Sequence, residues 1–240
     1  MSIARRIVAE GLGTAMLLAV VVGSGIMAER LAGGNVAIAL LANALATGAG
    51  LIALILMFGT ISGAHFNPVV TLSEAVQGNL PGREVLPYIL IQVVGAFAGV
   101  AAAHGMFGEP LFFASEHVRT GPAQWWSECV ATFGLIAVII GCSRSRPAVT
   151  PFAVAAYITA AYWFTSSTSF ANPAVTLARS MSNTFAGIRP ADAPGFIIAQ
   201  LIGAALATAV FCWLYPAAPA GATVAGTVAP GDFAVPPVKQ

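Results

Sequence analysis

The sequence predicts an all-α membrane protein, with six transmembrane helices and two re-entrant half-helices arranged as an inverted repeat of two three-span halves. Three observations support this fold class: the composition, six long apolar runs, and a set of residues that occurs twice in the same order. Apolar residues make up 58% of the 240 residues and charged residues 8%, against about 45–50% and about 25% in ordinary globular proteins. A chain with so few charged residues cannot cover itself with a water-compatible surface. Lipid is therefore the expected environment.

The apolar runs have nearly the length that a membrane span requires, which is about 20 residues for a helix crossing the hydrocarbon core. The six runs are approximately 7–27, 36–59, 85–106, 125–142, 151–167 and 194–215. The fourth and fifth are the shortest of the six. Two further pieces, 67–77 and 172–183, are too short to cross and are expected to enter the membrane and turn back.

The basic residues predict the orientation of these spans. One side of the six-span arrangement carries Arg5, Arg6, Arg83, Arg144, Arg146 and Lys239, and the other carries Arg30, Arg119 and Arg189. The positive-inside rule then places both termini in the cytoplasm, with the plasma (inner) membrane as the expected location. A cleaved signal peptide is the alternative for the first run, but this run is longer than a usual signal core and its pattern recurs mid-chain. The net charge of +1 and the lack of a basic cluster give no indication of nucleic-acid binding.

The repeat divides the chain into halves of about 1–118 and 119–216, which we expect to form one domain, followed by an irregular tail at 217–240. The paired features are, in order, Glu10 and Glu128, each with Thr four residues on; Asn-Pro at Asn67 and Asn172; and Gln-x-x-Gly-Ala at Gln92 and Gln200. Because each half has three spans, the second half starts from the opposite side of the membrane. Paired short segments in inverted halves indicate a site near the middle of the bilayer.

The short segments are expected to be half-helices that begin at the two Asn-Pro sequences. Asn is a good N-cap and Pro suits the first helical position, so the helix starts are Asn67-Pro68-Val69 and Asn172-Pro173-Ala174. Non-helical backbone at this depth is tolerated only in protein or beside a water-filled cavity. Two helix N-termini and two Asn amides would therefore meet there, presenting donors to an oxygen-bearing solute and repelling cations.

The two boxes and the duplicated layout resemble those of the aquaporin, or major intrinsic protein, family over about residues 7–215. The resemblance implies a right-handed bundle, one pore per chain and a homotetramer. It also implies roles for individual residues: Asn67 and Asn172 as pore donors, and Glu10 and Glu128 as anchors of the pore loops. The loop carbonyls that would form the acceptor ladder belong to Gly63, Ala64, His65 and Phe66 and to Thr168, Ser169, Phe170 and Ala171.

Several smaller assignments accompany these roles. A proton relay is the alternative for the two carboxylates, because an intramembrane carboxylate is a functional candidate by default. His65 is expected to pack in its loop rather than to gate the pore or bind metal. Thr71 and Thr176 are expected to bond helix backbone, and the glycines at 95 and 203 to allow close helix packing.

The sequence departs from the family pattern at the residue that follows the second box. Most members have Arg there, whereas this chain has Val175, and Val69 replaces Ala in the first box. Family spacing places the constriction at Thr47, Ala160, Ser169 and Val175, although a shift of two residues would substitute Tyr162 for Ala160. This set is small and neutral. It therefore suggests a divergent bacterial-type aquaglyceroporin that lacks the filter arginine.

Arg179 lies four residues beyond Val175, about 6 Å along a helix and on nearly the same face. One interpretation places it in the outer vestibule, where it would attract weak oxyacids. The other pairs it with Asp192 or Glu116, or turns it toward a neighbouring subunit.

The predicted function is passive conduction of small uncharged solutes, such as glycerol, urea or metalloid hydroxides like arsenite, together with water. A water-selective aquaporin is the main alternative; a non-conducting scaffold and an ion-coupled carrier are less favoured. Neither a catalytic constellation nor metal-ligand spacing is present in the sequence, since Cys129, Cys142 and Cys212 fall within or at the ends of spans. We expect no enzymatic activity, no cofactor and no metal.

Overall fold

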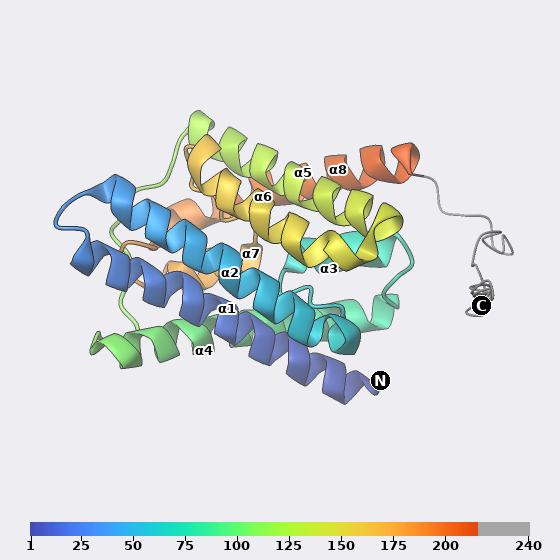
Figure 1. Ribbon diagram of the computed structural model, residues 1–240, viewed down its shortest axis with the longest axis horizontal. Helices are drawn as coiled ribbons and strands as arrows, with labels where there is room; N and C mark the ends of the chain where they lie inside the picture. Colours follow the sequence, from blue (N-terminus) through green and yellow to red (C-terminus); the bar gives the residue numbers. More distant parts are fainter. Residues whose placement is uncertain (216–240) are drawn as a thin grey trace, which may run out of the picture.

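The computed structural model describes residues 1–215, which form a bundle of helices without a named strand in that part of the chain (Figure 1). The long helices are α1 (Ile3–Leu31), α2 (Val36–Ser62), α4 (Gly82–Phe107), α5 (Pro122–Ser145), α6 (Thr150–Phe164) and α8 (Ala193–Leu214). Two short helices, α3 (Pro68–Val76) and α7 (Pro173–Arg179), follow the Asn-Pro sequences, and single 3-10 turns, η1 (Pro147–Val149) and η2 (Pro190–Asp192), precede α6 and α8. The predicted tail at 217–240 lies outside the described residues.

The expected spans agree with the helices, with one difference in length. Five segments are long and apolar enough to cross a membrane: α1, α2, α4, α5 and η2–α8. The fourth span is longer than its apolar run, because α5 has 24 residues and continues beyond the run at both ends. The remaining long helix, α6, corresponds to the fifth run and has only 15 residues, and Pro151 lies in its first turn. At 1.5 Å per residue α6 is shorter than the hydrocarbon core is thick.

The two halves of the bundle run in opposite directions. In Figure 1, α1 starts at the end of the bundle that holds the N-terminus, whereas α5 starts at the other end and runs back. α3 and α7 lie between the long helices, and each is capped by the side chain of its own asparagine, Asn67 or Asn172. The sequence therefore produces two short helices whose N-termini face each other inside the bundle.

In each half, a glycine brings one pair of long helices into backbone contact: α1 with α4, and α5 with α8. A Cβ at Gly95 on α4 would lie 2.4 Å from the carbonyl oxygen of Gly11 on α1, and one at Gly203 on α8 would lie 2.3 Å from that of Cys129 on α5. No real Cβ approaches a backbone atom so closely, so only glycine fits at either position. This matches the close packing expected for the two Gly-Ala pairs.

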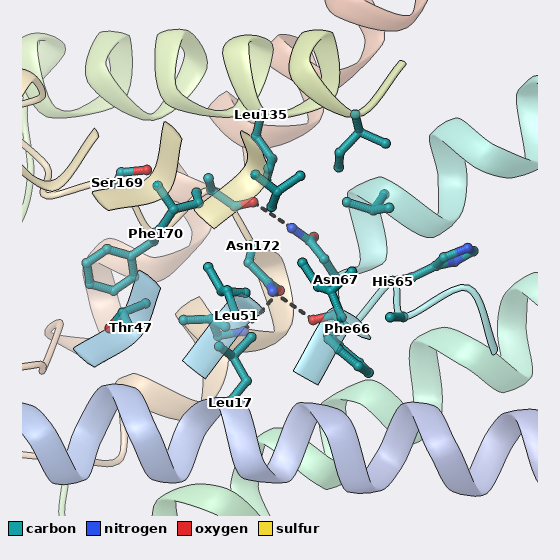
Figure 2. A pocket seen from close by; sticks show the side chains of 18 of the residues that line it. Leu17, Thr47, Leu51, His65, Phe66, Asn67, Leu135, Ser169, Phe170 and Asn172 are labelled. Carbon is teal, nitrogen blue, oxygen red and sulfur yellow. Dashed lines mark hydrogen bonds between the residues drawn. The ribbon is translucent and has the colours of Figure 1, made fainter. Parts of the chain in front are cut away.

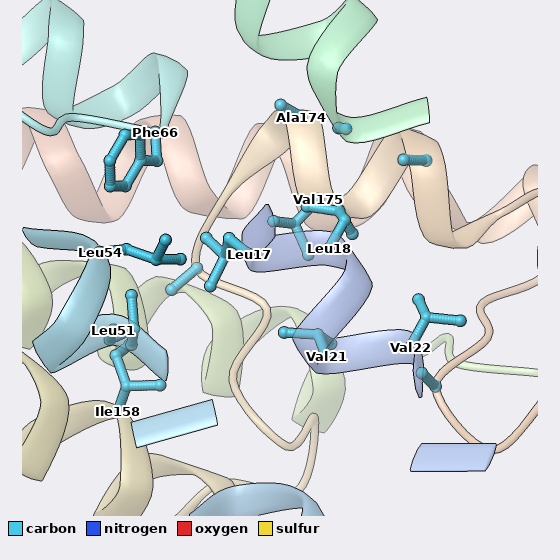
Figure 3. Close-up of a cluster of buried hydrophobic side chains, with 14 of the residues drawn as sticks. Leu17, Leu18, Val21, Val22, Leu51, Leu54, Phe66, Ile158, Ala174 and Val175 are labelled. Carbon is cyan, nitrogen blue, oxygen red and sulfur yellow. The ribbon is translucent and has the colours of Figure 1, made fainter. Parts of the chain in front are cut away.

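The hydrophobic core surrounds the site where the halves meet. Figure 3 shows Leu17, Leu18 and Val21 of α1 directed toward Val175 of the second half-helix. Val69 is fully buried in a second cluster with Ile136 and Ala207, so its extra methyl groups fill core volume. The departure from alanine at position 69 is therefore absorbed by packing against α5 and α8.

Candidate functional site

The two Asn-Pro sequences meet in a pair of reciprocal hydrogen bonds. The Asn67 side-chain amide donates to the Ala171 carbonyl at 2.8 Å, and the Asn172 amide donates to the Phe66 carbonyl at 2.8 Å (Figure 2). Each Oδ1 accepts from the first turn of its own half-helix. An asparagine amide carries two N–H groups, so one N–H of each side chain remains for another acceptor.

Each pore loop is held by a buried carboxylate. Glu10, fully buried, accepts from the backbone N–H groups of His65 and Phe66 at 2.9 and 2.8 Å, and also from the Ser62 hydroxyl. Glu128, also fully buried, accepts from the backbone N–H groups of Phe170 and Ala171, both at 2.9 Å. Hydrogen bonds from backbone N–H groups to a carboxylate are shorter and stronger than those between neutral groups, and here they determine which way the peptide groups point.

The loop backbone has an unusual conformation that accompanies these bonds. Five non-glycine residues have positive φ: Ala64, Phe66, Thr168, Ser169 and Ala171. Such residues are uncommon, and they persist where the surroundings dictate the conformation. With N–H groups drawn toward the carboxylates, the carbonyls of Phe66 and Ala171 are left to face the meeting point of the two halves.

The two glutamines of the repeat have a bonding role that the sequence did not reveal. Gln92 donates to Glu10 at 2.8 Å and to the Thr71 hydroxyl at 2.9 Å. Gln200 does the same for Glu128 and Thr176, at 2.6 and 2.9 Å. Each Thr hydroxyl in turn donates to its box asparagine carbonyl, as expected. The repeated Gln was visible in the sequence, but its partners lie 21 to 82 residues away.

A cavity of about 250 Å³ passes along this meeting point. Its walls include both box asparagines and the loop residues Gly63, Ala64, His65, Phe66, Ser169, Phe170 and Ala171. Figure 2 shows Leu17, Leu51 and Leu135 completing the lining with apolar side chains. A mostly apolar wall with a few convergent polar groups is typical of a small-molecule site.

Two predicted site residues, Ala160 and Thr168, do not line this cavity. Ala160 lies on an exposed face of α6, and Tyr162, two residues on, lines the cavity instead. Thr168 is not part of the wall; its hydroxyl is 3.4 Å from Nη1 of Arg119. Pro68, Val69, Pro173 and Ala174 are buried behind the wall, as residues that start the half-helices should be.

The residue that α6 contributes to the cavity wall differs from the predicted one. Tyr162 is 3% exposed, and its hydroxyl is hydrogen-bonded to that of Thr47 at 3.2 Å on the cavity wall. A phenol therefore occupies the place at which the sequence had suggested a methyl group. Ser169 and Val175 also line the cavity, and their role in a constriction stays a prediction. The set is consequently polar on one side and less open than Thr47, Ala160, Ser169 and Val175 would have been.

His65 lines the cavity at the first loop, where it is hydrogen-bonded rather than free. Its Nδ1 lies 3.1 Å from the Thr71 hydroxyl, and its ring packs against that of Tyr88 at a centroid distance of 5.4 Å. These contacts hold the ring in its loop, which is the packing role expected for it.

Arg179 also lines the cavity, and the ion pairs considered for it are not formed. Asp192 instead pairs with Arg189 at 2.8 Å and accepts from the backbone N–H of Arg119. The Nε of Arg179 donates to the Ala186 carbonyl, and its guanidinium carbon lies 3.4 Å from the centroid of the Phe170 ring.

A second arginine, Arg119, approaches the same aromatic ring. Its guanidinium carbon is 5.2 Å from the Phe170 centroid, and its Nε donates to the Gly187 carbonyl at 2.8 Å. Burial lowers the pKa of Arg119, while the carboxylate of Glu128 opposes that effect. An arginine nevertheless remains protonated at neutral pH, so two cations lie near the Phe170 ring, of which Arg179 lines the cavity. From the sequence, Arg119 served only to predict the orientation of the spans.

Taken with the inverted bundle, these features define a membrane pore protein: two half-helices end to end at a lined cavity, with donors and carbonyls facing its centre. The family model described as Major intrinsic protein matches residues 1–158. This chain belongs to that family, whose members are channels and not enzymes.

The similar proteins include both kinds of channel found in the family. The chain is 57% identical over 216 residues to Aquaglyceroporin AqpS of Rhizobium meliloti (strain 1021), covering 90% of this chain and 92% of the relative. It is 32% identical to Aquaporin AqpM of Methanothermobacter marburgensis, covering 89% and 98% of the two chains. The X-ray structure of the aquaglyceroporin from Plasmodium falciparum superposes with a TM-score of 0.64 at 18% identity, covering 89% of this chain and 96% of that one, which supports the fold.

Proposed function

We propose that this channel passes small uncharged solutes of the glycerol and urea type, and metalloid hydroxides such as arsenite, together with water. The observation that carries the proposal is Val175 in the cavity wall, directly after the second Asn-Pro-Ala. Valine supplies neither charge nor donor, whereas arginine supplies five N–H groups and a longer side chain. The wall at this position therefore leaves room for a solute larger than water.

The central groups supply the polar contacts that such a solute needs. The remaining N–H groups of Asn67 and Asn172 can donate to a hydroxyl oxygen, and the loop carbonyls can accept its proton. The apolar wall opposite, with Leu17 and Leu51, suits a carbon backbone. A polyol presents one polar and one apolar face, so it fits this lining. The similarity to an aquaglyceroporin supports the same assignment.

Stopped-flow measurements on proteoliposomes test this proposal. Water, glycerol, urea and arsenite fluxes are measured for the wild type and for Val175→Arg, with Val36→Arg as a control on an exposed position at the start of α2. We expect Val175→Arg to lower glycerol and urea flux by at least about tenfold, a barrier increase of about 1.4 kcal/mol, and to leave water flux nearly intact. The control variant should match the wild type.

Other results would select the alternatives. Unchanged glycerol flux in Val175→Arg would remove position 175 from the constriction. A wild type that conducts water but not glycerol would be a water-selective aquaporin, for which Tyr162 opposite Thr47 provides a structural reason. Saturable uptake driven by an ion gradient would indicate a carrier, and absence of any flux would indicate a scaffold.

We further propose a homotetramer, with one pore per chain, in the plasma (inner) membrane and with both termini cytoplasmic. The apolar side chains exposed on the outside of the bundle, such as Leu12, Leu56 and Leu90, suit lipid or a neighbouring subunit. Residue 1 and the end of α8 lie at the same end of the bundle (Figure 1). Native mass spectrometry and labelling of Ser2→Cys from each side of the membrane test the two statements.

A further inference from the structure

Arg179 is a buried cation that has no evident role in the passage of neutral solutes. The residue is 2% exposed. Its side chain is held by the hydrogen bond from Nε to the Ala186 carbonyl and by contact with the face of the Phe170 ring. These two contacts hold the guanidinium in one orientation. The residue lies one helical turn beyond Val175, and both line the same cavity.

The free end of this side chain faces the cavity. Among residues 1–215 neither Nη1 nor Nη2 of Arg179 has a hydrogen-bond partner, and neither is among the buried polar atoms sealed away from the surface. Four N–H groups on these nitrogens are therefore available, in the planar fork that matches two oxygens of one acid group. Buried polar groups are normally satisfied, which indicates that something in the cavity completes this one.

The surroundings of the guanidinium leave its charge uncompensated. The ion pairs within residues 1–215 join Arg6 to Glu84, Arg30 to Glu109 and Arg189 to Asp192, and none includes Arg179. The Glu128 carboxylate, the buried acid of this half, is engaged by two backbone N–H groups and Gln200. Arg119 adds a second cation at the same ring. An anion entering here would gain from both charges, and a cation would be repelled.

We propose that Arg179, which shares its cavity wall with Tyr162, forms a subsite for small hydroxy acids, whose acid group binds the guanidinium fork. The neutral side chain of Val175, one turn toward the centre, leaves space for the carbon and hydroxyl part of the solute. This inference rests on the proposed function, because the acid must share the pathway that glycerol uses. The subsite makes Arg179 a residue that selects among solutes.

Three probes of nearly equal size separate this subsite from the pore itself: glycerol, glycerate and 3-amino-1,2-propanediol, which are neutral, anionic and cationic at pH 7. Uptake of each is measured in proteoliposomes and corrected for protein-free vesicles. We expect glycerate to enter, the amine to be excluded, and Arg179→Gln to lower the ratio of glycerate to glycerol flux by about tenfold, as loss of a charge-assisted bond implies. Arg179→Lys, which keeps the charge and loses the fork, should give an intermediate ratio.

Arg30→Gln is the matched control, since Arg30 is an exposed arginine outside the cavity wall, paired with Glu109. If Arg179→Gln does not assemble, the wild type alone decides: glycerate should slow glycerol entry, and an equal concentration of the amine should not. Two results would overturn the subsite while leaving the channel assignment unaffected. One is normal glycerol flux in Arg179→Gln with an unchanged ratio of glycerate to glycerol flux. The other is normal glycerol flux in the wild type that glycerate does not slow. A wild type without glycerol flux overturns the proposed function itself.

Discussion

Replacing Glu128 by Gln tests whether the buried carboxylate holds the second pore loop. Glu128 accepts three hydrogen bonds, from the N–H groups of Phe170 and Ala171 and from the Gln200 amide at 2.6 Å. A glutamine has nearly the same shape, but only one of its two polar ends accepts. Its NH₂ group would therefore face a buried N–H donor, and the loop would lose the bond that orients it.

The size of the effect follows from these three bonds. Two bonds change from charge-assisted to neutral, each losing about 1 kcal/mol, and one buried donor is left unpaired at about 1–3 kcal/mol. The free energy of unfolding should fall by about 3–5 kcal/mol. With roughly 2–4 °C per kcal/mol for a chain of this size, the melting temperature should drop by roughly 6–20 °C.

Thermal unfolding in detergent and glycerol flux in proteoliposomes measure the two consequences. Glu29→Gln is the control, because Glu29 is exposed on α1. A Glu128→Gln protein with wild-type melting temperature and flux would refute the anchoring role. If the variant keeps its stability but loses a pH-dependent component of flux, the carboxylate would instead belong to a proton relay.

Two further predictions concern packing and the α6 correction. Gly203→Ala should lower the melting temperature by several degrees, because its Cβ would lie 2.3 Å from the Cys129 carbonyl oxygen and overpacking costs about 1–3 kcal/mol. Gly105→Ala is the control, because a Cβ at position 105 meets nothing within 4 Å, and it should leave the melting temperature unchanged. Equal melting temperatures would argue against backbone contact there. In a liposome swelling assay the wild type should exclude xylitol and Tyr162→Ala should admit it, whereas Ala160→Leu should behave like the wild type. A changed flux in the second variant would return position 160 to the pore.

The fold class was predictable because its signals are local or repeated. Composition and run length identify the spans, and the duplicated Asn-Pro boxes at Asn67 and Asn172 indicate two short helices that begin inside the membrane. An N-cap needs only its own first turn, and both asparagines cap their helices as expected. The structural match to an aquaglyceroporin supports the fold class.

The residue on α6 could not be placed by counting. Three residues between Phe164 and Asn172 have positive φ, and Glu128 accepts hydrogen bonds from the backbone of Phe170 and Ala171 in the same loop. The path of this loop therefore depends on a contact with a distant helix, and a count of residues does not give it. The bond from Phe170 joins residues 42 apart in the chain. Counting back 12 residues gave Ala160, and the folded loop places Tyr162 at the cavity instead.

The sequence by itself determined that this is a duplicated membrane bundle with two asparagines at its centre, because these features follow from periodicity, composition and capping. Only the tertiary structure decided which groups surround that centre. Gln92 and Gln200 reach their carboxylates across helix contacts, and Arg179 faces the cavity because Ala186 and Phe170 fold back onto it. Contacts between distant segments depend on packing geometry, which local sequence does not encode.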